Sequence, residues 1–225
     1  MSQYLYTSIT LDPSIREAVY LAGVELQQVK VLPRDETILE QLQKEIEALR
    51  ARYPAPAAAR ERFEPARWMY RTLGVDPTRT RPSSEALVRR ILQGKELFQI
   101  NSVVDAFNLL SIRFALPVGL YDTEYVVPPV IVRKGKAGEG YPGIGKEYVN
   151  LEGRLCLVDQ EGPFGNPSSD SARTRIRPET TGVLAVFFVP AVLEPQRARQ
   201  VLNECSGFVE RYLHPACFAS FMLHA

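Results

Sequence analysis

The sequence predicts an α+β fold organised as one large domain. Apolar residues at helical spacing dominate the chain before Pro117, and short β-branched runs separated by glycines and prolines dominate after it. Helices first and strands later, without regular strand–helix alternation, are typical of α+β proteins. The 225 residues are 45% hydrophobic and 24% charged, an ordinary composition for a globular protein with an apolar core.

Within this domain we expect residues 1–59 to form a strand–helix extension packed on the core, and residues 60–225 to form the main body with a C-terminal helix. Residues 4–10 alternate as a strand does. Asp12-Pro13-Ser14 predicts the start of a helix that ends at Gly23, and residues 24–32 alternate again. The proline-rich stretch 53–59 is too short for a domain linker and predicts a joint.

Helices are predicted both before and after this joint. A charged helix is expected from Pro33, with Ile38, Leu42, Ile46 and Leu49 forming one apolar stripe. Further helices are predicted over 60–74, over 82–94, and from a capping box at Ser102 and Asp105. The last helix begins at 193–195. Strands are predicted over 126–132, 148–151, 154–158 and 181–189.

Composition excludes several classes of function. No apolar run approaches the roughly 18 residues of a membrane span, and the N-terminus lacks the pattern of a secretory signal, so we expect a cytoplasmic protein with no membrane partner. The net charge of +1 gives no general affinity for nucleic acid, and no DNA binding is expected. Three cysteines and two histidines have no ligand spacing, so no metal or other cofactor is predicted. Cys156 and Cys205 fit core positions.

An arginine-rich segment, residues 60–95, is the main local concentration of positive charge. It holds nine basic residues against four acidic ones, with Phe63, Trp68 and Tyr70 interleaved. Arginine suits phosphate because its planar fork can donate two parallel hydrogen bonds. The segment is therefore either an RNA-backbone contact surface or a solvated helical face with ordinary salt bridges.

Two polar loops are candidates for a binding site. Residues 135–145 carry five glycines, which allow either close approach to a ligand or a simple turn between strands. Residues 164–171 offer hydroxyls and a carboxylate, including Ser169 and Asp170, which either line a pocket or form an exposed loop. No Ser-His-Asp or Cys-His set can be assembled from the sequence.

Three segments taken together resemble a known family. They are the stretch from Tyr70 through Arg-Pro-Ser-Ser-Glu at 81–85, the segment from Asn101 to Asp122 that includes Asn108, and the loop from Gly138 to Gly145 followed by Cys-Leu-Val-Asp at 156–159. In this order and at these distances they resemble the B3/B4 domain of the phenylalanyl-tRNA synthetase β subunit, in its freestanding form. The resemblance covers about residues 60–190 and implies a B3/B4-type fold, with helices first and a mixed or antiparallel sheet.

In the synthetase this domain hydrolyses tyrosine wrongly esterified to tRNA. The resemblance therefore implies a pocket for an amino acid on a tRNA 3′ end. It implies catalytic roles for Asn108 and Glu139, and substrate-binding roles for Asp122, Gly143 and Gly145. The polar loop 164–171 adds Ser169 and Asp170 as candidate substrate-binding residues. The arginine-rich segment 60–95 gives Arg79, Arg81, Arg89 and Arg90 as candidate RNA contacts. The sequence departs from the family at Gly119, where the synthetase has its editing histidine, and at Phe107, where it usually has threonine.

Three functions remain open on this basis. The first is a trans-acting editing hydrolase, which deacylates misacylated aminoacyl-tRNA with a positioned water and needs no protein nucleophile. The second is a non-catalytic module that binds tRNA or an amino acid, and the missing histidine at Gly119 favours it. The third is an enzyme that acts on a small metabolite, because a shared fold does not fix the reaction.

Overall fold

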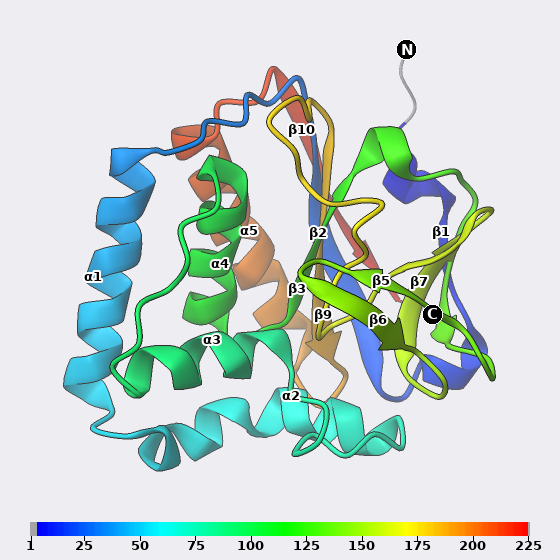
Figure 1. Ribbon diagram of the computed structural model, residues 1–225, viewed down its shortest axis with the longest axis horizontal. Coiled ribbons are helices and arrows are strands. Elements are labelled where there is room, and N and C mark those ends of the chain that lie inside the picture. The colour runs from blue at the N-terminus through cyan, green and yellow to red at the C-terminus, as the bar shows by residue number, and fades with distance from the viewer. Residues whose placement is uncertain (1–3, 225) are drawn as a thin grey trace.

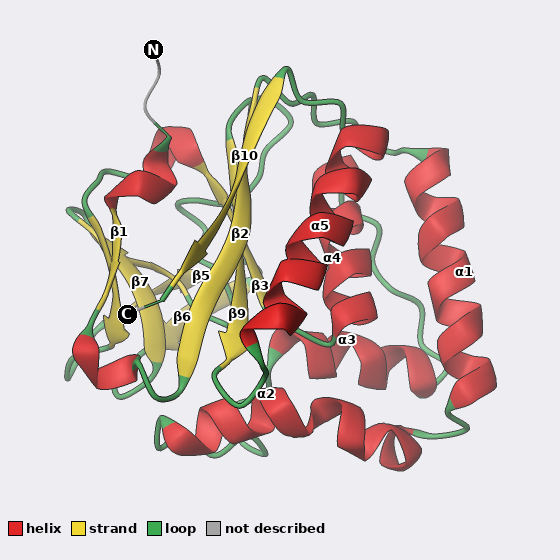
Figure 2. Cartoon of the chain, turned by 180° about the vertical axis from the view of Figure 1, so that it is seen from behind, coloured by secondary structure: helices red, strands yellow, loops and turns green. Residues whose placement is uncertain are grey.

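The fold has three layers, a helical layer and two sheets (Figures 1 and 2). The structure is a computed structural model that describes residues 4–224, apart from the side chain of Lys146. Helices cover one face of the sheet β10-β2-β9-β3, and the sheet β1-β4-β7-β8 covers its other face. The predicted α+β class is confirmed. No helix in the described residues has the length and apolar character needed to cross a membrane.

The helical layer matches the predicted helices closely. Its members are α1 (Glu36–Arg52), α2 (Arg60–Thr72), α3 (Ser83–Leu92), α4 (Ser102–Phe114) and α5 (Pro195–Tyr212). The apolar stripe of α1 is buried at Ile38, Leu42 and Leu49, as its spacing predicts, and α1 packs on α3 and α4. Asp35 caps α1 by accepting hydrogen bonds from the backbone N–H groups of Thr37 and Ile38.

The predicted capping box of α4 is one residue out of place. Asn101 is the N-cap, and its side-chain oxygen accepts from Val104 N at 2.9 Å. Ser102 instead accepts from Leu32 N at 3.0 Å, and Asp105 accepts from Ile100 N at 3.0 Å. The prediction failed because asparagine caps as well as serine does, and the Ser102 hydroxyl instead holds the loop between β2 and α1 through Leu32.

The two large sheets are mostly antiparallel. The first joins β10 (Cys217–Leu223), β2 (Val19–Gln27), β9 (Val183–Pro190) and β3 (Val118–Asp122). The second joins β1 (Ile9–Leu11), β4 (Val130–Lys134), β7 (Leu155–Asp159) and β8 (Gly162–Gly165), with β1 and β4 parallel. A separate hairpin is made of β5 (Gly140–Gly143) and β6 (Lys146–Asn150).

Strand β9 is apolar throughout and β2 is nearly so, because both of their faces are buried. The exception inside β2 is the buried Glu25, whose carboxylate accepts hydrogen bonds from Leu5 N and Tyr6 N. Ala22 and Phe187 face the helical layer, whereas Leu21, Val186 and Phe188 face the second sheet. A strand covered on both sides has no solvent face to occupy with polar residues, which explains the unbroken apolar run after residue 182. The middle layer therefore contributes to two separate cores.

The prediction of a helix ending at Gly23 is wrong. Only a short 3-10 turn, Pro13–Ile15, follows the Asp12 cap, and Gly23 lies in the middle of β2. A Cβ at Gly23 would lie 2.1 Å from the carbonyl oxygen of Ala185 on β9, so the glycine permits close strand packing and does not end a helix. Since β2 lies between β10 and β9, residues 1–59 supply an interior strand of the main sheet.

Other strand predictions are displaced or missing. A strand predicted over 4–10 is a 3-10 helix, Leu5–Ser8, followed by the short β1. The strand predicted over 126–132 begins only at Val130, after the proline pair 128–129. Strand β10 was not predicted, because His214-Pro215 breaks the chain and the remaining tail is short. Cys156 and Cys205 are buried, as predicted.

Candidate functional site

A loop of residues 166–171, which follows β8, is folded around the side chain of Asn166. Its amide oxygen accepts hydrogen bonds from Ser168 N at 2.6 Å and Ser169 N at 3.0 Å, the arrangement of an Asx turn. Its amide nitrogen donates to the hydroxyl of Tyr141 at 2.9 Å, and that hydroxyl donates to Ser169 O at 2.6 Å. Tyr141 lies on β5, so the β5–β6 hairpin holds the loop in place.

Two main-chain hydrogen bonds also join this loop to the glycine turn of the hairpin. Ile144 N donates to Asp170 O at 3.3 Å, and Ala172 N donates to Pro142 O at 2.9 Å. Gly145 completes the turn with a φ of +67°, a conformation that glycine adopts without strain. The structure therefore brings four predicted site residues into one region, namely Gly143, Gly145, Ser169 and Asp170.

The carboxyl group of Asp170 lies against strand β3. Its Oδ2 accepts from Leu120 N at 3.3 Å. Its Oδ1 is buried without a hydrogen-bond partner, and so is the hydroxyl of Tyr121. These two groups lie close enough for each to shift the pKa of the other, although they form no hydrogen bond of good geometry. A buried acceptor and a buried donor are thus adjacent and unused, an uncommon pattern that calls for an explanation.

Burial decides the ionisation of both groups. Loss of solvent raises the pKa of Asp170 to about 7, despite the opposing effect of the hydrogen bond from Leu120 N. Burial also raises the pKa of Tyr121 well above its usual value, and the Asp170 charge raises it further. Near neutral pH the carboxyl is therefore close to half ionised, while the phenol keeps its proton.

Tyr121 fills the space that the absent side chain at position 119 leaves open. A Cβ on Gly119 would lie 1.9 Å from the Tyr121 hydroxyl, and a Cβ on Gly165 would lie 2.2 Å from it. The ring also meets Phe164 edge to face, with the centroids 4.9 Å apart. The glycine that departs from the family pattern is therefore coupled to the tyrosine two residues later on the same strand.

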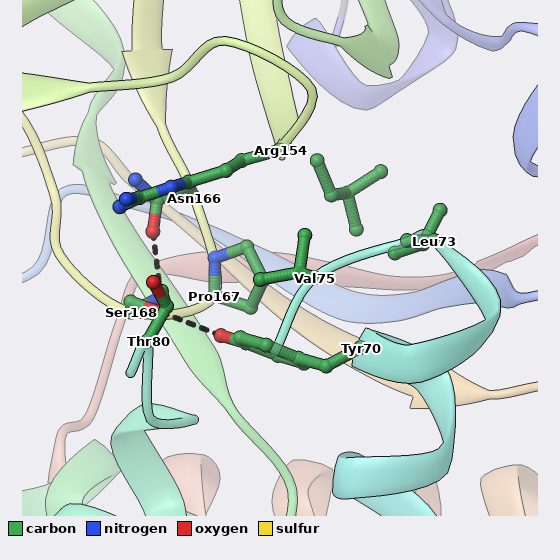
Figure 3. Close-up of a pocket in the computed structure, with 9 residues that line it drawn as sticks. Tyr70, Leu73, Val75, Thr80, Arg154, Asn166, Pro167 and Ser168 are labelled. Atoms are coloured by element: carbon green, nitrogen blue, oxygen red, sulfur yellow. Dashed lines mark hydrogen bonds between the residues drawn. The ribbon is translucent and has the colours of Figure 1, made fainter. Parts of the chain in front are cut away.

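A small pocket adjoins the loop on the side of α2 (Figure 3). It is lined by Tyr70, Thr80, Arg154, Asn166 and Ser168 among others, and the hydroxyls of Tyr70 and Ser168 lie 2.6 Å apart. Its volume of about 10 Å³ holds roughly one water molecule. An amino acid would therefore have to displace the loop or the β5–β6 hairpin in order to enter.

Two predicted site residues are occupied by ion pairs and hydrogen bonds. Glu139 forms a bidentate pair with Arg133, with both distances 2.7 Å, and accepts from Lys136 N. The Arg133 guanidinium lowers the pKa of Glu139 to about 2, so this carboxylate is a poor proton acceptor near neutral pH. Asp122 accepts from Thr180 Oγ1 at 2.5 Å and from Glu124 N at 3.1 Å. Both arrangements fix the ends of hairpins and loops.

Asn108 lies on α4 and is half buried. Helix α4 packs against α1, α3 and β3, whereas β5 packs on β8. Both views place α4 in the helical layer and the β5–β6 hairpin on the other side of β3 (Figures 1 and 2). The proposed pairing of Asn108 with the glycine turn stays a prediction.

The four predicted RNA-binding arginines differ in their surroundings. Arg79 is 90% exposed and lies 3.8 Å from Asp76. Arg81 and Arg89 pair with Glu85 at 3.6 Å and 2.7 Å. Arg90 turns the other way: it donates to Glu96 O at 2.5 Å, and its guanidinium lies 4.3 Å from the centre of the Phe98 ring.

Sequence reasoning missed the aromatic and amide part of the site. Tyr121 and Tyr141 were not among its candidates, and Tyr70 and Asn166 were included only as members of the 60–95 segment and the 164–171 loop. A tyrosine in an apolar segment is ordinarily assigned to the core, and all three are indeed buried. The available signal was the pairing of Gly119 with Tyr121, because a glycine two residues from a large side chain on one strand leaves room beside it.

Comparison with known proteins identifies the family. The model of the B3/4 domain matches residues 66–224. The chain belongs to the B3/4 domain family. It is 30% identical over 141 residues to the phenylalanine–tRNA ligase beta subunit of Geobacter metallireducens, an alignment that covers 58% of this chain and 17% of that subunit. The chain thus matches less than a fifth of the length of this relative.

A solved structure is similar over most of the chain. It is an N-terminal fragment of the phenylalanyl-tRNA synthetase β subunit from Pyrococcus horikoshii, with a TM-score of 0.47 and 15% identity, covering 91% of this chain and 48% of that one. The likeness is too distant to transfer any residue's role. The family match, and not this superposition, relates the chain to tRNA synthetases.

Proposed function

We propose that this B3/4 protein hydrolyses the ester bond of a misacylated aminoacyl-tRNA, acting in trans, at the 166–171 loop. The observation that carries the proposal is the adjacent pair of unpartnered polar atoms, Asp170 Oδ1 and the Tyr121 hydroxyl, beside the Gly143–Gly145 turn. One atom can accept a proton and the other can donate a hydrogen bond. Ester hydrolysis requires both abilities.

The chemistry assigns each group one task. The ionised Asp170 carboxyl takes a proton from a water whose oxygen attacks the ester carbonyl carbon. The protonated Tyr121 hydroxyl donates to the oxyanion that develops on the carbonyl oxygen. When the bond between the carbonyl carbon and the ribose oxygen breaks, that oxygen takes the proton back from Asp170. The products are a free amino acid and a deacylated tRNA, and the carboxyl is regenerated.

A pKa near 7 supports this assignment, because a general base is most effective when its pKa lies near the working pH. Glu139 is excluded from the role by its pairing with Arg133. The proposal also requires the loop to open, since the adjoining pocket holds only about one water. The loop's attachment to a two-stranded hairpin, which is a marginal structure on its own, favours such opening.

The test is a deacylation screen with a panel of misacylated tRNAs. Wild-type protein should deacylate at least one of them. Asp170→Asn should reduce the rate by about 10²–10⁴-fold, the usual contribution of a general base. Tyr121→Phe should reduce it by about 10²-fold, as loss of one oxyanion donor does. Asp35→Asn is a matched control, because asparagine caps α1 as well as aspartate does.

A second candidate is a module that binds tRNA or an amino acid without catalysis. The filling of the Gly119 position by Tyr121 favours it, since a substrate group has no room there while the ring is in place. This candidate predicts that every misacylated tRNA survives incubation while tRNA affinity remains measurable. Persistent ester hydrolysis by wild-type protein, lost in Asp170→Asn, rules it out.

A further inference from the structure

Three arginines from α2, the 76–82 segment and α3 converge on one buried carboxylate of α3. Arg67, Arg81 and Arg89 lie 3.0, 3.6 and 2.7 Å from Glu85 Oε1. The Glu85 side chain is only 1% exposed, whereas the arginine side chains are between 19% and 41% exposed. The Glu85 carboxylate therefore orients three guanidinium groups at the surface. Its single negative charge neutralises only one of their three positive charges.

The arginines are held in fixed orientations by further contacts. Arg67 also donates to Thr78 Oγ1 at 3.3 Å, and the Arg89 guanidinium lies 5.5 Å from the centre of the Phe63 ring. An ordinary exposed arginine loses side-chain entropy when it binds a partner. Arginines that are already oriented lose less, so this cluster is better prepared for phosphate binding than a solvated helical face.

The cluster continues to the pocket beside the 166–171 loop. Thr80 lines that pocket, and its chain neighbours are Arg79 and Arg81. Tyr70 and Arg154 line the same pocket as Thr80. Figure 3 shows Arg154 reaching across the pocket toward Asn166. The guanidinium of Arg154 has no hydrogen bond or ion pair with any residue in the described range 4–224.

The surroundings of each arginine show whether it belongs to this arginine surface. Arg90 is turned away onto Phe98 and does not belong to the surface. Arg67, which the sequence analysis included only as a member of the 60–95 segment, does belong to it, and so does Arg154, which the sequence analysis did not assign. The partner must carry several negative charges in a row, since the cations are distributed over α2, the 76–82 segment, α3 and the start of β7. Planar guanidinium groups in such a row suit the phosphates of a nucleic-acid strand.

We propose that Arg79, Arg81 and Arg154, with Arg67 and Arg89 oriented behind them by Glu85, bind consecutive phosphates of an RNA strand whose end enters at Thr80. The inference rests on the proposed function for the identity of the strand, the 3′ end of a tRNA. Glu85 is a positioning residue here, because it contacts the arginines and not the RNA.

The test is the salt dependence of the binding of uncharged tRNA to the full chain. The surface variant is Arg79→Gln, Arg81→Gln, Arg154→Gln. The matched control is Arg34→Gln, Arg52→Gln, Arg199→Gln, which removes the same charge from α1, its N-terminal loop and α5, where all three arginines are exposed. The surface variant should reduce the slope of log K against log salt by about 2, at about 0.7 per single-strand phosphate contact.

The control should leave that slope and the affinity within about twofold of wild type. Equal losses in both variants would overturn the proposal, because net charge alone would then explain binding. Binding of poly-glutamate as tight as that of tRNA would also overturn it, since the surface would then lack preference for phosphate. Glu85→Gln gives an independent check: although it removes a negative charge, it should weaken tRNA binding, and tighter binding would contradict the positioning role.

These outcomes are separable from failure of the proposed hydrolysis. If the surface variant alone loses tRNA binding while no misacylated tRNA is deacylated by wild-type protein, the RNA surface stands and the hydrolase does not. If deacylation occurs and the two triple variants bind tRNA equally, the hydrolase stands and this surface falls.

Discussion

The two cores of this B3/4 protein differ in what they bury. The core between the helices and the sheet β10-β2-β9-β3 is apolar, and the polar residues near it, such as Asn101 and Asp105, serve as caps at the start of α4. The region around the 166–171 loop instead buries a carboxyl oxygen of Asp170, the amide of Asn166 and three tyrosines. The comparison indicates that the first core stabilises the fold, whereas the second region contains buried polar groups that lower its stability.

The largest expected loss of stability comes from the apolar core. Phe107 is fully buried on α4 and lies 6.3 Å from the ring of Phe187. Phe107→Ala should lower the free energy of unfolding by about 3–5 kcal/mol, measured by urea denaturation, because it leaves a cavity that neighbours cannot fill. The pH dependence of stability should be unchanged. A loss below about 1 kcal/mol would contradict the assignment of this core as the stabilising one.

The next effect concerns the buried carboxyl. Because its pKa is about 7 in the folded chain and about 3.9 in an unfolded one, the folded state binds more protons between these values. Its contribution to stability is therefore full below about pH 4 and is lost as the pH rises toward 7, by up to about 4 kcal/mol.

Asp170→Asn removes this dependence. The variant should be more stable than wild type at pH 7.5 and similar to it at pH 4, in urea denaturation at both values. An identical pH dependence in the two proteins would show that Asp170 titrates as an ordinary exposed carboxyl.

A smaller effect tests the coupling of Gly119 to Tyr121. Gly119→Ala should destabilise the protein by about 1–3 kcal/mol, because its Cβ would overlap the tyrosine hydroxyl. In a Tyr121→Leu background the same substitution should have little effect. Thermal unfolding of the four proteins completes a double-mutant cycle, and additive changes would contradict the coupling.

The smallest effect concerns the start of α4. Asn101→Ala should reduce stability by about 1 kcal/mol through loss of the N-cap hydrogen bond to Val104. Chemical denaturation measures it, and hydrolysis should not change, because the cap belongs to the apolar half. If Asn101→Ala leaves the stability unchanged, Ser102 and not Asn101 is the N-cap of α4.

The helical half could be predicted from the sequence because its signals are local. Ile38, Leu42 and Leu49 report a helix and its buried face through spacing alone, whatever they pack against. The failures in this half are equally local, and they amount to one residue at the α4 cap. Long-range geometry decides the strands. Local sequence rules predict that Gly23 ends a helix. In the structure it lies within β2, where the backbone of β9 approaches it closely.

The candidate site divides in the same way. Ser169 and Asp170 could be predicted, since a polar, turn-rich loop after a strand is a common place for functional groups. The partner Tyr121 could not, because its hydroxyl meets Asp170 only after β3 and β8 have come together. The pairing of Glu139 with Arg133 was also invisible, since it forms across the 133–139 segment as that segment folds. Asn108 stays a prediction from the family resemblance.

The most direct test of the central claim is the pH dependence of kcat/KM for a misacylated tRNA that the protein hydrolyses, after subtraction of spontaneous hydrolysis. The rate should rise with pH and level off above an inflection near 7, where Asp170 becomes ionised. Asp170→Asn should lose both the rate and the inflection. A variant that keeps the wild-type rate and the same inflection would contradict the role of Asp170 as the base.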